Sequence, residues 1–274
     1  MTYINQNGFL EQTDSEMSRM QNRGFTYGDS LFDVLKFEDG KVAFLEDHYF
    51  RLMSSMRMLR MKIPKHFTLE GYEKELLKTL EANNIDDSAR LRVSVFRAGG
   101  GFYFPESNLS EYRIETGRLT QVADSPYEIE LFKDYHVSSG LLSTVKTNNR
   151  LVNVLGSIFA KENDYQNSIL INERKELVGA TDANLFLVKG DKIITPSLNS
   201  GCINGIIRKK VIEHLKSKES RVVEETAVSP FELLKVDEVF LTNSIVGLQP
   251  VYKYRKKKFQ DSVTRNIRLQ LFSL

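Results

Sequence analysis

One lysine stands where an apolar run gives way to a helix. The stretch "STVKTNNRL" places Lys146 before a helix whose apolar stripe is Leu151, Leu155 and Ile158. A lysine at the mouth of a sheet, partly removed from water, has a lowered pKa and a nucleophilic amine. Such an amine can form a Schiff base and then move protons. On this stretch alone, a solvated lysine at a strand end is the favoured interpretation.

Two later stretches offer groups that could bind a ligand. In "NSGCINGIIRKKVIEHL", Gly205 precedes a helix with Ile207, Val211 and Leu215 on one side. The N–H groups at such a helix start can hold a phosphate, although most glycines of this kind only form turns. In "FLTNSIVGLQPV", the polar residues 242–244 follow a buried strand, where they suit ligand oxygens or a plain turn.

Two stretches near the N-terminus add candidates. His48 and Arg51 in "LEDHYFRL" are three residues apart on an expected helix, so they lie on nearby faces. An arginine there could bind a phosphate or form a surface salt bridge. In "NRGFTYGDSLFDVLKF", Tyr27 falls in a tight turn that leads into a strand.

Periodicity predicts the elements that must position these residues. Apolar spacings of three and four predict helices at 45–59, at 68–82 with Thr68 as its cap, at 149–162 and at 205–217. A short helix is expected at 230, and alternation predicts strands elsewhere, including "LLSTV" at 141–145. We therefore predict an α+β protein with an N-terminal α+β domain at 1–118. A strand-rich C-terminal domain at 119–274 is expected to carry the lysine.

Composition excludes several other classes. The chain has 274 residues, a net charge of +2, one cysteine and four scattered histidines, so we expect neither a disulfide nor a metal site. No window is apolar enough to span a bilayer, so we expect a cytoplasmic protein with no membrane partner. The basic run "YKYRKKKF" at 252–259 is interpreted as an exposed hairpin at a sheet edge, and no nucleic-acid partner is expected.

The order of the stretches is more specific than any one of them. The motifs "RGFTYGDSLFDV", "FLEDHYFRL", "VKTNNRL", "DANLF", "GIIR" and "TNSIVGLQPV" follow the order typical of class IV pyridoxal-phosphate enzymes. The chain resembles this family over nearly its whole length. The family contains branched-chain aminotransferases, D-amino-acid aminotransferases and 4-amino-4-deoxychorismate lyases. The motifs "NRL" and "TNSIVGLQPV" look closest to the lyases, since aminotransferases more often have tyrosine where Arg150 stands.

The resemblance implies the two-domain fold of type IV pyridoxal 5'-phosphate (PLP) enzymes, similar to D-amino-acid aminotransferase. It also implies a cofactor site between the domains and a homodimer. By position, Lys146 resembles the catalytic Schiff-base lysine, and Arg51 resembles the arginine that binds the cofactor's phosphate. The other residues that the resemblance implies are Ile206, Ile207, Ser244, Gly179 and Arg150 for the cofactor, and Tyr27, Phe32, Arg97 and Asn243 for the substrate.

Two positions depart from the family pattern. Ile207 stands where the family usually has threonine, which removes a hydroxyl but keeps the backbone N–H. Gly179 stands where the family has a glutamate facing the pyridine nitrogen, and without it a carbanion-like intermediate is less stabilised. Glu176 is an odd number of strand residues away and is expected to face the other side. Asp182 could replace the carboxylate only if the turn bends it back.

The resemblance favours a lyase that acts on 4-amino-4-deoxychorismate. The substrate amine would replace Lys146 on the cofactor, Lys146 would take the ring proton, and pyruvate would leave as the ring becomes aromatic. One alternative is an aminotransferase for branched-chain or related amino acids. A second is a catalytically impaired descendant that binds the cofactor or a partner protein, which Gly179 and Ile207 motivate.

Overall fold

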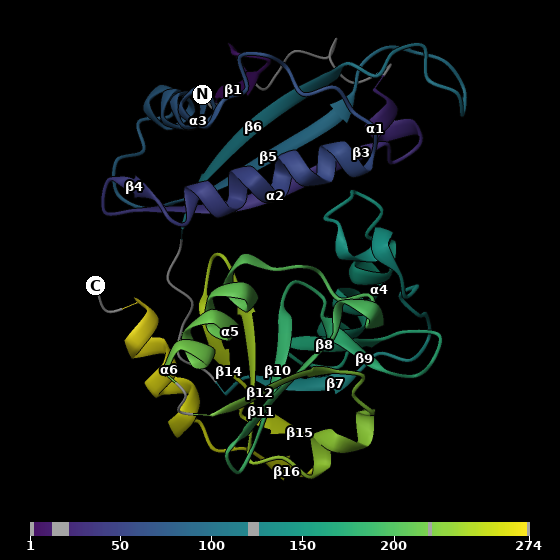
Figure 1. Ribbon diagram of the computed structural model, residues 1–274, viewed down its shortest axis with the longest axis vertical. Coiled ribbons are helices and arrows are strands. Elements are labelled where there is room, and N and C mark those ends of the chain that lie inside the picture. Colours follow the sequence, from purple (N-terminus) through teal and green to yellow (C-terminus); the bar gives the residue numbers. More distant parts are fainter. Residues whose placement is uncertain (1–2, 13–21, 120–125, 219–220, 273–274) are drawn as a thin grey trace. The chain divides into compact units, whose positions relative to one another are not determined.

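The chain divides into two compact units. The computed structural model describes residues 3–12, 22–119, 126–218 and 221–272 (Figure 1). Unit 1 comprises Met1–Val122 together with Lys146–Asn149, and unit 2 comprises Ala123–Val145 and Arg150–Leu274. Lys146 therefore packs with unit 1, although the residues on both sides of its short segment belong to unit 2. The predicted boundary between 118 and 119 stays a prediction.

Unit 1 is an antiparallel sheet with helices packed against it. The sheet has the order β2-β1-β6-β5-β3-β4, and Figure 1 shows α2 crossing one face of it. The bounds of these elements are β1 Tyr3–Gln6, β2 Phe9–Gln12, α1 Arg23–Thr26, β3 Ser30–Glu38, β4 Lys41–Val42, α2 Leu45–Met58, α3 Leu69–Ala82, β5 Ala89–Arg97 and β6 Ser110–Arg118.

Helices α2 and α3 of unit 1 form where the sequence predicts them, whereas α1 was not predicted. In α2, Leu52 and Met56 are buried, as the stripe at spacings of three and four requires. The side chain of Thr68 accepts a hydrogen bond from the N–H of Gly71 and so caps α3, which confirms the predicted cap. Alternating residues of β3 are buried, because one face of the sheet lies against the helices.

Unit 2 contains two five-stranded sheets. Their orders are β12-β11-β10-β13-β14 and β16-β15-β7-β8-β9. The strands are β7 Glu128–Leu131, β8 Asn167–Ile171, β9 Leu177–Ala180, β10 Asn184–Lys189, β11 Lys192–Pro196, β12 Val222–Thr226, β13 Glu238–Asn243, β14 Gly247–Pro250, β15 Lys253–Tyr254 and β16 Lys257–Lys258. The helices are η2 Leu141–Thr144, α4 Leu151–Glu162, η3 Leu198–Ser200, α5 Ile206–Lys218, η4 Pro230–Leu234 and α6 Ser262–Phe272.

Both sheets of unit 2 contribute to one core. Ile129 and Ile169 come from one sheet, and Leu185 and Leu241 come from the other. All four side chains are buried, so the strands read as nearly continuous apolar runs in the sequence. Helix α5 packs against β12 and β13, and α6 packs against β14 (Figure 1).

One predicted strand is wrong. Residues 141–144 of this run form the 3₁₀ helix η2, and its two leucines, Leu141 and Leu142, are 69% and 62% exposed. The hydroxyl of Thr144 donates to the carbonyl of Leu141 at 2.7 Å, and the hydroxyl of Ser143 donates to the carbonyl of Ser138. Hydroxyl groups that bond to nearby carbonyls favour a turn over a sheet ladder.

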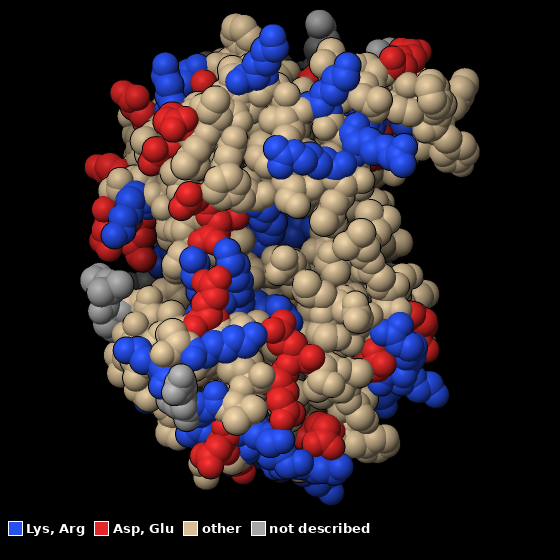
Figure 2. Space-filling view, viewed as in Figure 1, with Lys and Arg blue, Asp and Glu red and all other residues tan. Residues whose placement is uncertain are grey.

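The basic run 252–259 forms the edge hairpin β15–β16, as predicted. Lys253 pairs with Glu128 at 2.7 Å, and Arg255 pairs with Glu130 at 3.4 Å. Figure 2 shows positive and negative side chains interleaved over the face in view. Within the described ranges, none of the helices has the length and hydropathy needed to cross a membrane.

Candidate functional site

Lys146 lies in a short extended segment along the edge of β3. The N–H of Phe32 donates to the carbonyl of Lys146 at 2.8 Å, and the N–H of Asn148 donates to the carbonyl of Ser30 at 3.1 Å. Thr147 forms an antiparallel bridge with Leu31 between these bonds. The backbone of the segment is therefore held on both sides of Thr147, which fixes where the lysine side chain begins.

A second cation lies near the lysine. The Nζ of Lys146 lies 4.5 Å from the centre of the Phe32 ring, and the guanidinium carbon of Arg92 lies 4.3 Å from the same ring centre. Arg92 donates to the Oδ1 of Asn148 at 3.2 Å. Burial, and then the charge of Arg90, lowers the pKa of Arg92. Two cations around one aromatic ring make this part of unit 1 suited to an anionic ligand.

Arg51 and His48 reach the same buried carboxylate, that of Asp33. The Nη2 and Nε of Arg51 donate to the two carboxylate oxygens at 2.5 and 3.3 Å, and the Nδ1 of His48 lies 3.1 Å from one of them. The three-residue spacing on α2 therefore puts both side chains at one point, as expected for neighbouring helix faces. The side chain of Arg51 is 14% exposed and the side chain of Asp33 only 2%.

The start of α5 in unit 2 forms a backbone cradle. The side-chain amide of Asn184 donates to the carbonyl of Ile203 at 2.8 Å, which ties the loop before the helix to β10. A Cβ on Gly205 would lie 2.0 Å from the Oδ1 of Asn184, so a larger residue here requires the Asn184 side chain to move. The N–H groups of Ile206 and Ile207 lie in the first helical turn, which has no carbonyl acceptors inside the helix.

Polar side chains follow β13 at the position expected from the sequence. The Oδ1 of Asn243 accepts from the N–H groups of Ile245 and Val246 at 3.0 and 2.9 Å, so this side chain shapes the turn that contains Ser244. The hydroxyl of Thr242 is buried and has no hydrogen-bond partner among the described residues. A buried hydroxyl of this kind is a donor that a ligand oxygen could satisfy.

The position of Gly179 is closed by backbone. Gly179 lies in β9, and a Cβ there would lie 2.8 Å from the carbonyl oxygen of Ala183. That oxygen already accepts from the N–H of Ala180 at 2.8 Å. The turn between β9 and β10 therefore occupies the space in which a side chain at 179 would begin.

The two nearby carboxylates are engaged elsewhere. Glu176 accepts from the guanidinium of Arg174 and, at 2.8 Å, from the amide of Asn172. Asp182 is exposed and accepts from the amide of Asn167 at 2.8 Å. Both have protein partners that hold them in structural networks of unit 2.

Other predicted residues have well-defined partners. Arg97 is buried and binds the carboxylate of Asp29 at 2.8 Å, the Oδ1 of Asn108 at 2.6 Å and two backbone carbonyls. Tyr27 is 39% exposed and packs against Tyr103. In unit 2, burial lowers the pKa of Arg150 to about 10, and its guanidinium donates to the carbonyl of Val145. The substrate role predicted for Arg97 stays a prediction, since its known partners hold the scaffold of unit 1.

Three residues of the site were missed in the sequence. Asp33 occupies a position of β3 where alternation predicts an apolar residue. A charged residue at such a position indicates a buried ion pair, so the sequence does carry a signal for Asp33. Arg92 faces the same side of the sheet as Phe32, which alternation also predicts. The role of Asn184 depends on its contact with the loop at 203–205, and the sequence carries no comparable signal for it.

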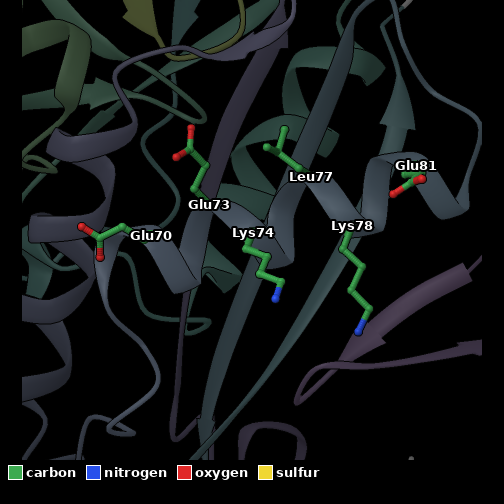
Figure 3. Close-up of a pocket in the computed structure, with 6 residues that line it drawn as sticks. All are labelled: Glu70, Glu73, Lys74, Leu77, Lys78 and Glu81. Atoms are coloured by element: carbon green, nitrogen blue, oxygen red, sulfur yellow. The ribbon is translucent and has the colours of Figure 1, made fainter.

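A surface hollow on α3 is a different feature. Figure 3 shows the six side chains of this one helix that line it: Glu70, Glu73, Lys74, Leu77, Lys78 and Glu81. Lys78 donates to the carbonyl of Gly8 and lies 3.9 Å from Glu75, so its charge is used within unit 1. None of the predicted site residues lines this hollow.

Comparison with known proteins gives the family context. The model of the family described as amino-transferase class IV matches residues 30–254. The chain is 26% identical over 242 residues to the aminodeoxychorismate lyase of Vibrio harveyi, which covers 84% of each chain. It is 24% identical over 277 residues to a D-alanine aminotransferase of Staphylococcus epidermidis, which covers 99% of this chain and 95% of that one.

Among solved structures, the branched-chain amino acid aminotransferase of Escherichia coli is similar to this chain, with a TM-score of 0.89 at 21% identity. The match covers 100% of this chain and 94% of that one. At this identity the likeness establishes the fold alone, and it confirms the predicted α+β fold of type IV. Lyases and aminotransferases both occur among the similar proteins, so the comparisons leave both reactions open.

Proposed function

Because the chain belongs to the amino-transferase class IV family, whose members are PLP-dependent enzymes, we propose that it binds PLP and splits 4-amino-4-deoxychorismate. The products would be 4-aminobenzoate and pyruvate, and the reaction needs no further reactant. When bound, PLP supplies an aldehyde that takes up the substrate amine and a ring that draws in electrons from the carbon losing a proton. The remaining chemistry rests on side chains of this chain.

The groups present fit a phosphate. Arg51 supplies a charged guanidinium, and the first turn of α5 supplies backbone N–H donors. The hydrogen bond from Asn184 to the carbonyl of Ile203 holds the loop before that turn in place. Thr242 adds an unsatisfied buried hydroxyl beside Ser244 at the end of β13. These observations support Arg51 in unit 1 and the start of α5 in unit 2, each by itself, as candidates for phosphate binding.

Lys146 is proposed to attach the cofactor and to move the substrate proton. Its backbone is held at β3, and its amine lies over the face of Phe32, which removes part of its water. An amine in this setting can act as a nucleophile and then as a general base once the substrate amine has displaced it. Arg92 supports the proposal as a nearby cation that could orient a carboxylate of the substrate.

The closed position at Gly179 is the observation that favours the lyase. A carboxylate facing the pyridine nitrogen would strengthen the ring as an electron acceptor, but the carbonyl of Ala183 lies where a side chain at 179 would begin, and both Glu176 and Asp182 are engaged elsewhere. Formation of an aromatic product lowers the free energy of the elimination products. We therefore expect elimination to depend less on that carboxylate than transamination does.

The test is the release of 4-aminobenzoate by the PLP-loaded protein supplied with 4-amino-4-deoxychorismate. The release is followed by chromatography, and the Lys146→Ala variant serves as the control. We expect release by the wild type and at least about a thousandfold slower release by the variant, since the lysine serves both attachment and proton transfer. Absence of 4-aminobenzoate from a protein that binds PLP would refute the lyase assignment.

A second assay separates the remaining alternatives. The same protein is given a branched-chain amino acid or D-alanine with a 2-oxo acid acceptor. Formation of the matching keto acid without any 4-aminobenzoate in the first assay would assign transamination instead. A protein that gains no visible absorbance with PLP, and no borohydride-reducible adduct at Lys146, would be a descendant without this chemistry.

A further inference from the structure

Asp33 is a carboxylate on the apolar face of a strand. It lies in β3, where Leu31, Leu35 and Phe37 share its face and are buried with it. The residue is 1% exposed. Buried carboxylates are rare unless they are paired, so its partners must account for its presence among these apolar side chains.

Arg51 provides the largest part of that pairing. Its Nε and Nη2 atoms both face the carboxylate, at 3.3 Å from Oδ2 and 2.5 Å from Oδ1. Two parallel bonds of this kind fix the plane of a guanidinium as well as its position. The α2 helix holds the base of the arginine side chain, and Asp33 holds its end.

His48 and the backbone complete the shell around the carboxylate. The Nδ1 of His48 lies 3.1 Å from Oδ1, and the N–H of Val34 donates to the same oxygen at 2.7 Å. Burial alone would raise the pKa of Asp33, but the charges of Arg51 and His48 outweigh it and hold that pKa well below its usual range. Asp33 is therefore ionised and can only accept, so His48 is the donor in its pair.

An ionised group at this point has two opposite effects on an anion that binds Arg51. Its charge repels the incoming anion and neutralises part of the arginine's attraction. Its two hydrogen bonds to Arg51 also hold the guanidinium in one orientation before the anion arrives, which reduces the entropy lost on binding. The two effects change affinity in opposite directions, so they can be separated by experiment.

We propose that Asp33 is a positioning residue that orients Arg51 toward the phosphate of the bound cofactor, with orientation outweighing repulsion. This inference rests on the proposed binding of PLP. Asp33 acts through Arg51 and touches neither the substrate nor the reacting atoms. The group that benefits is the phosphate, so a ligand that lacks the phosphate should not respond to changes at Asp33.

The experiment compares PLP with pyridoxal, which has the same ring and aldehyde but no phosphate. Dissociation constants for both are measured on apo-protein through the visible absorbance of the lysine adduct. For D33N we expect PLP binding to weaken by about tenfold to a hundredfold, the scale of a lost charged hydrogen bond, with pyridoxal binding unchanged within about twofold. D33E keeps the charge but moves the carboxylate relative to Arg51. We therefore expect a smaller loss of affinity, again for PLP and not for pyridoxal.

Two controls tie the effect to Arg51. Glu38→Gln removes a charge from the exposed end of the same strand, where Glu38 pairs with Lys36, and we expect no change for either ligand. In an Arg51→Ala background, D33N should weaken PLP binding no further, because the group that Asp33 orients is already absent. If D33N is too unstable at the titration temperature to be measured, the same comparison of PLP with pyridoxal is made with D33E, alone and in the Arg51→Ala background.

Each result has a distinct meaning. Tighter PLP binding in D33N would show that repulsion outweighs orientation and would overturn the proposal. Equal losses for PLP and pyridoxal would assign Asp33 to the fold or to Lys146, which also overturns it. A wild-type protein that binds neither ligand would instead refute the proposed function, so the two failures are distinguishable.

Discussion

The two units offer groups for an anion that are built in different ways. Unit 1 uses charged side chains, with Arg51, His48 and Asp33 meeting at one buried point. Unit 2 uses backbone, with the first turn of α5 held by the contact between Asn184 and Gly205. The group in unit 1 depends on charge and hydrogen-bond geometry. The group in unit 2 depends on the lack of a side chain at Gly205. Substitutions that remove a group should therefore damage unit 1, and substitutions that add one should damage unit 2.

The strongest test of this contrast in unit 2 is Gly205→Ala. The added Cβ would lie 2.0 Å from the Oδ1 of Asn184, so Asn184 must move and loses its bond to the carbonyl of Ile203. We expect the free energy of unfolding to fall by about 1–3 kcal/mol and PLP affinity to fall by about tenfold or more. Chemical denaturation and absorbance titration measure the two effects.

Gly117→Ala is the matched control for this variant. A Cβ at Gly117 meets no heavy atom within 4 Å, so the same chemical change is made in open space. We expect stability and PLP affinity close to those of the wild type. If Gly205→Ala behaved like this control, the cradle would not depend on the close approach of Asn184.

The next effect is expected at Gly179, on stability alone. Its Cβ would lie 2.8 Å from the carbonyl of Ala183, a backbone atom that moves only with the whole turn. We expect Gly179→Ala to lower the free energy of unfolding by about 1–2 kcal/mol, again against Gly117→Ala. Because the turn already fills the position, Gly179→Glu should also fail to raise the rate of 4-aminobenzoate release. A faster Gly179→Glu enzyme would show that the turn can move and that the missing carboxylate limits the reaction.

The contrast also explains which features could be predicted from sequence. Periodicity located α2 and α3 almost to the residue, because an apolar stripe and a capping threonine are local signals. The same approach failed at 141–145, where hydroxyl groups bonding to nearby carbonyls favoured a 3₁₀ turn over a strand. Local hydrogen bonding of this kind does not alter the apolar pattern, so the pattern alone predicts a strand.

The candidate site shows the same division. Motif order predicts Lys146 and Arg51 as site residues, and the structure adds the partners that hold them. Asp33 could have been recognised, since a charge at an apolar position of a strand requires buried partners. The contact between Asn184 and Gly205 joins positions 21 residues apart through a fold that the sequence does not display, and no local pattern reports it.

The smallest effect is expected at a second arginine–carboxylate pair, in unit 2. We call such a pair, joined by two hydrogen bonds, a fork. Arg174 donates to the two oxygens of Glu176 at 3.2 and 2.9 Å, much as Arg51 does to Asp33, but both partners are partly exposed. Hydrogen bonds from Arg174 and then from Asn172 lower the pKa of Glu176 to about 2. A depressed carboxyl pKa stabilises the fold above the unfolded-state value of about 4.3, and this contribution is lost as the pH falls toward 2.

Glu176→Gln should therefore be slightly less stable than the wild type near neutral pH, and the difference should shrink as the pH is lowered through this window. Melting temperatures of the two proteins between pH 6 and pH 3 measure it, and PLP affinity at neutral pH should stay unchanged. An exposed fork is screened by solvent and contributes little, whereas a buried fork holds its arginine in place. A loss of PLP affinity in Glu176→Gln comparable to that expected for D33N would show that burial is not what separates the two forks.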